Sequence, residues 1–164
     1  MPIIQIRSAT ESDIPVLLDM IRQLAEYEKL AHLVTATEGR LRQTLFGSQP
    51  AAEVLLADYQ RECAGFAAFF ATYSTFLAQP GLYLEDLYVK PHLRGQGVGS
   101  ALMRRLAGIA VERGCRRLEW GVLDWNEPSI RFYTNLGAEP LRDWTKYRLS
   151  GVALEKLALG GIDA

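Results

Sequence analysis

Glycines cluster in one short stretch, Arg94-Gly95-Gln96-Gly97-Val98-Gly99. The apolar run at 82–89 that precedes it is rich in the aromatic and branched residues that favour a β-strand. A helical pattern follows, with Val98, Leu102 and Leu106 spaced four residues apart. A glycine-rich turn between a strand and a helix exposes backbone N–H groups beside the positive end of the helix dipole. The spacing therefore predicts a site for an anion, most often a phosphate.

Two common phosphate loops do not fit this stretch. The P-loop of nucleoside triphosphatases ends in Gly-Lys-Ser/Thr, whereas Gly99 is followed directly by Ser100. The G-x-G-x-x-G dinucleotide fingerprint fails in both registers, because Ser100 and Leu102 stand where its third glycine is needed. The pattern that remains is Arg94-x-x-Gly97-x-Gly99. By itself, it is equally consistent with a phosphate site and with an ordinary strand-to-helix turn.

The elements around this stretch alternate as in a mixed α/β fold. Thr10 and Asp13 form a capping-box pattern before an amphipathic helix that we expect to end at about Tyr27 or Glu28. Gly114 is expected to end the helix that begins after the glycine-rich stretch. We expect further helices at 37–46, 130–136 and 152–159, strands at 3–7, 53–58, 64–73, 82–89, 117–123 and 145–149, and a loop at 74–81.

Composition and charge narrow the class of protein. The 164 residues are 49% hydrophobic and 23% charged, which is typical of a soluble globular protein. A net charge of −1 gives no indication of a nucleic-acid or membrane partner. The only cysteines, Cys63 and Cys115, show no disulfide framework, and His32 and His92 do not pair with them at zinc spacing. The apolar stretch at 63–76 is too short to cross a bilayer, so we expect a cytoplasmic protein without a metal site.

Two motifs and the order of the elements point to one family. Arg94-x-x-Gly97-x-Gly99 resembles the acyl-CoA pyrophosphate loop of the GCN5-related N-acetyltransferases, the GNAT superfamily. The segment from Asn126 to Ala138 resembles that family's later cofactor motif, in which an Asn lies near the pantetheine arm and a Tyr lies near the thioester sulfur. Together with the segments at 84–89 and 25–28, these motifs are similar to the diamine (spermidine/spermine) acetyltransferase branch.

The resemblance implies a fold and a co-substrate. It implies a mixed, mostly antiparallel α/β sheet flanked by helices, in a single N-acetyltransferase domain over residues 1–164 that uses acetyl-CoA. It also implies that the strand at 84–89 separates from its neighbour, so that its free backbone groups bind the pantetheine and stabilise the oxyanion. The cofactor-binding residues implied in this way are Leu87, Tyr88, Val89, Arg94, Gly95, Gln96, Gly97, Val98, Gly99, Ser100, Asn126, Pro128, Ser129 and Tyr133.

Two side chains are candidates for proton transfer. An alkylammonium has a pKa of about 10.4, so a carboxylate must attract the cation and accept its proton, directly or through water. Glu85 is our candidate, whereas Asp86 is expected on the opposite face of the strand in a structural role. A phenol has a pKa of about 10 and is protonated at neutral pH, so Tyr133 is the candidate proton donor to the departing thiolate. By residue type alone, a surface carboxylate and a core aromatic are more common, and only the motifs favour catalysis.

The expected acceptor is a small cationic amine, such as a diamine or polyamine. Carboxylates and an aromatic face attract cations. The chain between Gly137 and Trp144, however, looks shorter than in the eukaryotic polyamine enzymes, where this segment helps to line the amine site, so it departs from the polyamine pattern. Lysine-like amino acids such as thialysine, a protein lysine, and a non-catalytic acyl-CoA-binding module remain alternatives. The resemblance and an apolar stretch at 152–157 predict a homodimer. The candidates for amine binding are Tyr27, Glu28, Glu85, Glu119 and Asp124, with Asp143 as a looser one.

Overall fold

The computed structural model describes residues 3–160, which form two compact units divided between residues 123 and 124. The first unit contains the sheet and three α-helices, and the second contains two α-helices. The single domain expected over residues 1–164 stays a prediction, and residues 1–2 and 161–164 lie outside the described part of the chain.

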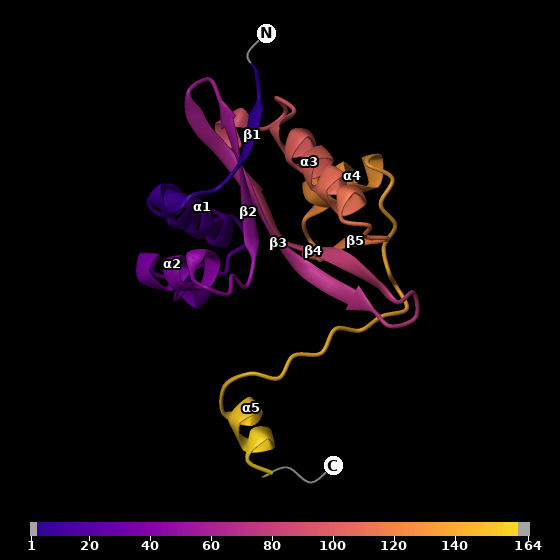
Figure 1. Ribbon diagram of the computed structural model, residues 1–164. Coiled ribbons are helices and arrows are strands. Elements are labelled where there is room, and N and C mark those ends of the chain that lie inside the picture. The colour runs from indigo at the N-terminus through magenta and orange to yellow at the C-terminus, as the bar shows by residue number, and fades with distance from the viewer. Residues whose placement is uncertain (1–2, 161–164) are drawn as a thin grey trace. The chain divides into compact units, whose positions relative to one another are not determined.

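A five-stranded sheet is the framework of the first unit (Figure 1). The strands lie in the order β1-β2-β3-β4-β5, so strands that follow one another in the chain are also neighbours in the sheet. The first four strands pair antiparallel, whereas β5 runs parallel to β4 after the crossover through a helix. The prediction of a mixed, mostly antiparallel α/β sheet is therefore confirmed. The strands are β1 (Gln5–Ser8), β2 (Glu53–Tyr59), β3 (Glu62–Ser74), β4 (Gln79–Val89) and β5 (Leu118–Trp120).

Helices cover both faces of this sheet. Helices α1 (Ile14–Tyr27) and α2 (Glu38–Phe46) lie on one face and α3 (Val98–Glu112) lies on the other (Figure 1). Apolar residues of α1 pack against Phe66 and Tyr88 of the sheet, which forms the core of that face. Three short 3-10 helices, at Glu11–Asp13, Ala31–Leu33 and Pro91–Leu93, complete the elements of this unit.

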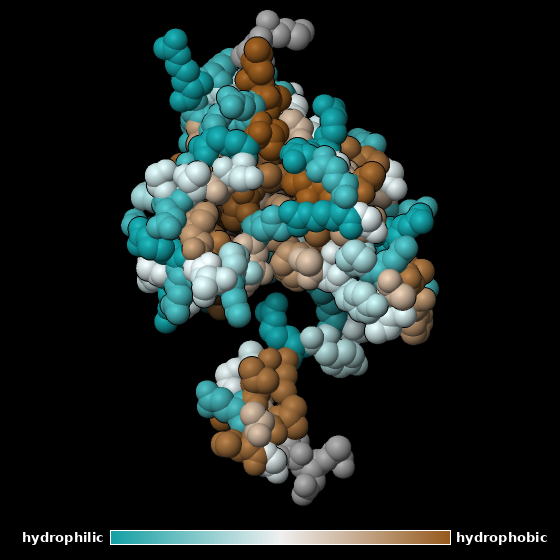
Figure 2. All heavy atoms as spheres, viewed as in Figure 1, coloured by the Kyte–Doolittle hydropathy of each residue, from teal (hydrophilic) through white to brown (hydrophobic). Residues whose placement is uncertain are grey.

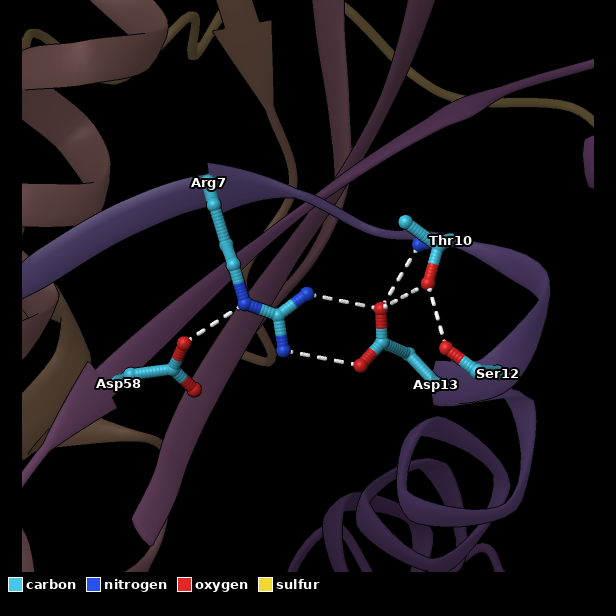
Figure 3. A network of polar contacts seen from close by, with 5 residues as sticks. All are labelled: Arg7, Thr10, Ser12, Asp13 and Asp58. Carbon is cyan, nitrogen blue, oxygen red and sulfur yellow. Dashed lines mark hydrogen bonds and ion pairs between the residues drawn. The ribbon is translucent and has the colours of Figure 1, made fainter. Parts of the chain in front are cut away.

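Arg7 connects β1 to the start of α1 and to the end of β2 (Figure 3). Its Nε donates to Asp58 Oδ2 at 2.7 Å, and its two Nη groups donate to the two carboxylate oxygens of Asp13 at 2.8 and 2.9 Å. The backbone N–H of Thr10 also donates to Asp13 Oδ2, at 2.8 Å, which confirms the predicted capping box. The guanidinium holds the pKa of Asp13 well below its usual range. This stabilisation is therefore complete above about pH 4 and is lost as the pH falls through the lowered pKa.

The structure departs from the sequence prediction in several elements. Strand β4 begins at Gln79, so the expected loop at 74–81 is only a short turn between two long strands. Strand β5 covers three residues rather than the expected 117–123. Helix α4 (Glu127–Asn135) begins before the expected Ile130, because Asn126 accepts the Ser129 N–H at 3.4 Å and caps the helix. The strand predicted at 145–149 is wrong, since these described residues are exposed and form no β-ladder.

Exposed apolar side chains characterise the C-terminal part of the second unit. Helix α5 (Gly151–Ala158) is amphipathic, yet Val152, Leu154 and Leu157 are 65%, 51% and 49% exposed. The brown surface over α5 in Figure 2 shows how these side chains gather. Tyr147, in the extended segment before α5, is 94% exposed. This unit thus presents an apolar surface of the kind that mediates association.

Among residues 3–160, no helix is long and apolar enough to cross a membrane. The cytoplasmic location and the lack of a nucleic-acid partner stay predictions.

Candidate functional site

The glycine-rich loop adopts backbone conformations that favour glycine. Gly95 and Gly97 have φ values of 77° and 86°, and Gly97 is the N-cap of α3. A Cβ at Gly95 would meet no atom within 4 Å, and one at Gly97 would meet only Ile4 Cδ1, at 3.7 Å. The glycines are therefore required by the backbone conformation rather than by crowding within the protein, and the outer side of the loop is open.

The first turn of α3 leaves backbone donors available at this loop. The first helical hydrogen bond runs from the Ala101 N–H to the Gly97 carbonyl, at 2.9 Å. The N–H groups of Val98, Gly99 and Ser100 precede it and have no acceptor within the helix. This set of donors, at the positive end of a 15-residue helix, is suited to bind a phosphate.

Arg94 lies at the entrance to the loop and is oriented by β4 and α1. Its Nε donates to the Val89 carbonyl at 3.0 Å. Its guanidinium carbon is 4.8 Å from the ring centroid of Tyr27 and 5.9 Å from that of Tyr88. Three predicted cofactor residues and one predicted amine-binding residue, Tyr27, are thus in contact at this point.

Other side chains of the predicted cofactor site are directed into the protein. Tyr88 is 3% exposed, and its hydroxyl donates to Gln23 Oε1 at 2.8 Å. The hydroxyl of Tyr59 lies 3.5 Å from Gln96 Oε1 and links the loop to the end of β2. Tyr88 can therefore offer only its backbone to a ligand, in agreement with the role that the resemblance implies.

Strand β4 separates from β5 near its C-terminal end. The parallel pairing covers Leu82 to Leu84 on β4 and ends at the pair Leu84 and Trp120. In the described part of the chain, residues 85–89 have no strand partner on that edge. On this side the Val89 carbonyl accepts from Arg94 Nε and no described strand bonds to the other peptide groups, and the segment leads directly to the glycine-rich loop.

A β-bulge occurs where β4 separates from β5. Ala68 of β3 pairs with Asp86 and Phe69 pairs with Leu84, so Glu85 is the extra residue on β4. Regular alternation of side chains stops at this residue. The expectation that Asp86 points away from Glu85 assumed regular alternation, and the bulge removes its basis.

Three carboxylates interact beside this bulge. Burial raises the pKa of Asp86 to about 6, and the charges of Glu85 and Glu28 contribute to the increase. Burial also raises the pKa of Glu28, near the end of α1. Glu85 itself is exposed. Sequence reasoning assigned Asp86 to a structural role, because neither its burial nor its proximity to Glu28 has a sequence signal. We call Glu28, Glu85 and Asp86 the acidic cluster.

The remaining predicted residues are distributed over both units. Glu119 on β5 pairs in register with Tyr83, and its Oε2 lies 3.9 Å from Arg117 Nε. Asp124, Asn126, Pro128, Ser129 and Tyr133 belong to the second unit. In that unit, Asn126 is 4% exposed at the start of α4, and the ring of Tyr133 lies 5.3 Å from that of Phe132.

One cavity lies outside this site. It measures about 270 Å³, and Phe69, Glu53 and Arg113 are among its lining residues, but none of the predicted site residues lines it. Arg113 forms a two-point ion pair with Glu53 at 2.6 and 2.8 Å, so its charge is already compensated. Within residues 3–160, no group of three or more His, Cys, Asp or Glu side chains could hold a metal ion.

Comparison with known proteins gives a consistent result. The sequence model described as the acetyltransferase (GNAT) family matches residues 18–138. The chain is 40% identical to thialysine N-epsilon-acetyltransferase of Sus scrofa, over 93% of this chain and 96% of that one. It is 33% identical to L-ornithine N5-acetyltransferase of Arabidopsis thaliana, over 93% and 87%. A Vibrio cholerae integron cassette protein of known structure is 28% identical, with a TM-score of 0.79 and coverage of 94% and 97%.

Proposed function

Because the chain belongs to the GNAT family of acetyltransferases and is an acetyl-CoA-dependent N-acetyltransferase, we propose that its acceptor is a small lysine-like amine. The observation that carries this proposal is the acidic cluster, which lies beside the unpaired edge of β4. Of the acceptors considered from sequence, the relatives favour the lysine-like alternative over a polyamine, since four of them are named for thialysine.

The residues of the glycine-rich loop fit acetyl-CoA. The free N–H groups of Val98, Gly99 and Ser100 suit its pyrophosphate, and the open edge at 87–89 suits the amide groups of its pantetheine arm. When bound, acetyl-CoA supplies the acetyl group as a reactive thioester. Asn126 and Tyr133 remain proposed members of this site on the strength of the motif alone.

The acidic cluster suits the first requirement of amine acetylation. The acceptor arrives as an ammonium ion and must lose a proton before its nitrogen can attack. Exposed Glu85 is the proposed proton acceptor, directly or through water, while Asp86 and Glu28 attract the cation. The proton that the amine releases thus passes to a carboxylate. Tyr133 is proposed to donate a different proton, that of its hydroxyl, to the departing thiolate.

A panel of amines tests the proposal. Acetyl-CoA-dependent release of the CoA thiol should give the highest kcat/KM for thialysine, lysine and ornithine, with putrescine and spermidine below them. A neutral arylamine should be a poor acceptor, because the acidic cluster offers it no electrostatic advantage. A higher rank for aminoglycosides, arylamines or acidic amino acids would contradict the proposal. Binding of CoA without turnover of any amine would favour the non-catalytic alternative.

We expect Asp86→Asn to change the pH dependence of the reaction. The free wild-type protein loses the Asp86 charge as the pH falls through about 6, whereas the variant has no charge to lose. The wild-type kcat/KM for thialysine should therefore exceed that of Asp86→Asn by about tenfold at pH 8, and the ratio should approach one below about pH 5. Both proteins share the titration of the amine itself, so the ratio isolates Asp86.

The matched control for this profile is Glu112→Gln. Glu112 is an exposed carboxylate on α3 that accepts from Arg105 at 2.9 Å, and its loss should leave the ratio near one at every pH. An Asp86→Asn profile that runs parallel to the wild-type profile would exclude Asp86 from amine recognition.

We also propose that the protein is a homodimer. The exposed apolar side chains of α5 support this proposal, since a monomer would leave them in water. Light scattering at micromolar concentration should give twice the mass of 18.3 kDa. Adding charge at the surface, as in Leu154→Lys, should shift the protein towards the monomer. A monomeric mass for the unmodified chain would contradict the proposal.

A further inference from the structure

Arg94 is held on several sides by groups that are themselves fixed. The Val89 carbonyl at the end of β4 accepts from its Nε at 3.0 Å, and the rings of Tyr27 and Tyr88 lie 4.8 and 5.9 Å from its guanidinium carbon. Tyr88 is buried and bound through its hydroxyl to Gln23 at 2.8 Å. The otherwise flexible arginine side chain is thereby ordered before a ligand binds, so it loses less conformational entropy on binding.

The contacts of Arg94 leave its outer donors available. Its contacts with described residues use the Nε and the face of the guanidinium, so the two Nη groups have no acceptor among residues 3–160. No carboxylate in that range forms an ion pair with it, unlike Arg7 and Arg113. An arginine that is oriented but not neutralised, at the entrance to a phosphate loop, is prepared for bidentate contact with a phosphate.

Tyr27 is the nearer of the two aromatic rings, and it is the last residue of α1. The next residue, Glu28, belongs to the acidic cluster. The end of one helix therefore carries an aromatic ring that contacts Arg94 and, directly after it, a carboxylate whose charge acts on Asp86.

We propose that Tyr27 is a positioning residue for acetyl-CoA, whose ring holds the Arg94 guanidinium so that its Nη groups can bind a phosphate of CoA. This differs from the amine-binding role that the sequence suggested for Tyr27. The inference rests on the proposed function, because it assumes that the loop binds acetyl-CoA.

Calorimetric titration with CoA tests the proposal in the full-length protein. Tyr27→Leu keeps an apolar side chain but removes the aromatic face, so it should weaken CoA binding by about threefold to tenfold. Tyr27→Phe keeps the face and should stay within about twofold of wild type. At saturating acetyl-CoA, the KM for thialysine should be unchanged in both variants. If Tyr27→Leu melts below the assay temperature, Tyr27→Gln takes its place.

A double-mutant cycle identifies the route of the effect. Arg94→Ala should weaken CoA binding by about tenfold to a hundredfold, and adding Tyr27→Leu to it should cost nothing further. An equal cost of Tyr27→Leu in both backgrounds would overturn the proposal, as would a Phe variant as weak as the Leu variant. A raised KM for thialysine with unchanged CoA affinity would assign Tyr27 to the amine instead. Failure of the wild-type protein to bind CoA would contradict the proposed function itself.

Discussion

Replacing Gly97 with Asp should raise the KM for acetyl-CoA by about a hundredfold or more, which corresponds to a loss of about 2.7 kcal/mol of binding free energy. Gly97 is the N-cap of α3, and the unpaired N–H groups of the next three residues follow it. A carboxylate at this position would compete with the pyrophosphate for these donors and would repel its charge. The fold should survive, because a negative charge at a helix N-terminus is favourable.

Gly97→Asn is the matched control for this substitution. Asn has the shape of Asp without its charge, and both residues tolerate the left-handed conformation that φ of 86° requires. It should raise the KM by only about tenfold, through crowding at the open side of the loop. Calorimetry that finds unchanged CoA affinity in a folded Gly97→Asp protein would refute the assignment of this loop.

Tyr133→Phe should lower kcat by about a hundredfold, the lower end of the range for a positioned general acid. The substitution keeps the ring and its contact with Phe132, at 5.3 Å between centroids, and removes only the hydroxyl. CoA affinity and the melting temperature should change little, because the lost group acts mainly in the transition state. A thiolate is a moderate leaving group, since a free cysteine has a pKa of about 8.5, so water can partly replace the acid and the loss should be incomplete.

Tyr147→Phe provides the control for this measurement. Tyr147 lies in the same unit and is 94% exposed, so removal of its hydroxyl should leave kcat at the wild-type value. Steady-state rates at saturating amine and acetyl-CoA decide between the outcomes. A Tyr133→Phe protein with nearly wild-type kcat would return this residue to a packing role and leave the proton donor unidentified.

The sequence predicted correctly those features that depend on residues close to one another in the chain. The capping box at Thr10 and Asp13, the end of α1 at Tyr27 and the glycine that follows α3 all depend on neighbours within a few residues. The glycine-rich turn before α3 belongs to the same class, because its glycines and the helix after it are adjacent in the chain.

Features that depend on distant partners were not predictable in this way. The bulge at Glu85 is a property of how β3 and β4 pair, and the raised pKa of Asp86 depends on its burial in the fold and on the charges of Glu85 and of Glu28, the residue after α1. The segment at 145–149 alternates as a strand does, yet a strand also needs a partner, and in the described chain it has none. The contact of Tyr27 with Arg94 joins residues 67 positions apart, and no pattern in the sequence around either residue predicts it.

Asp86 is half-buried, and the protonation of its carboxyl group is therefore coupled both to folding and to the proposed binding of the amine. Between about pH 4 and pH 6, the folded chain retains a proton that an unfolded aspartate, with a pKa of about 3.9, has already released. The favourable contribution of protonated Asp86 is complete below about pH 4 and is lost as the pH rises through about 6. A bound ammonium favours the carboxylate, so the arrival of the amine near pH 6 should expel this proton into solvent. The observed enthalpy of amine binding will then depend on the buffer that takes up the proton. As the pH rises through about 6, the free energy of unfolding should fall less for the complex than for the free protein.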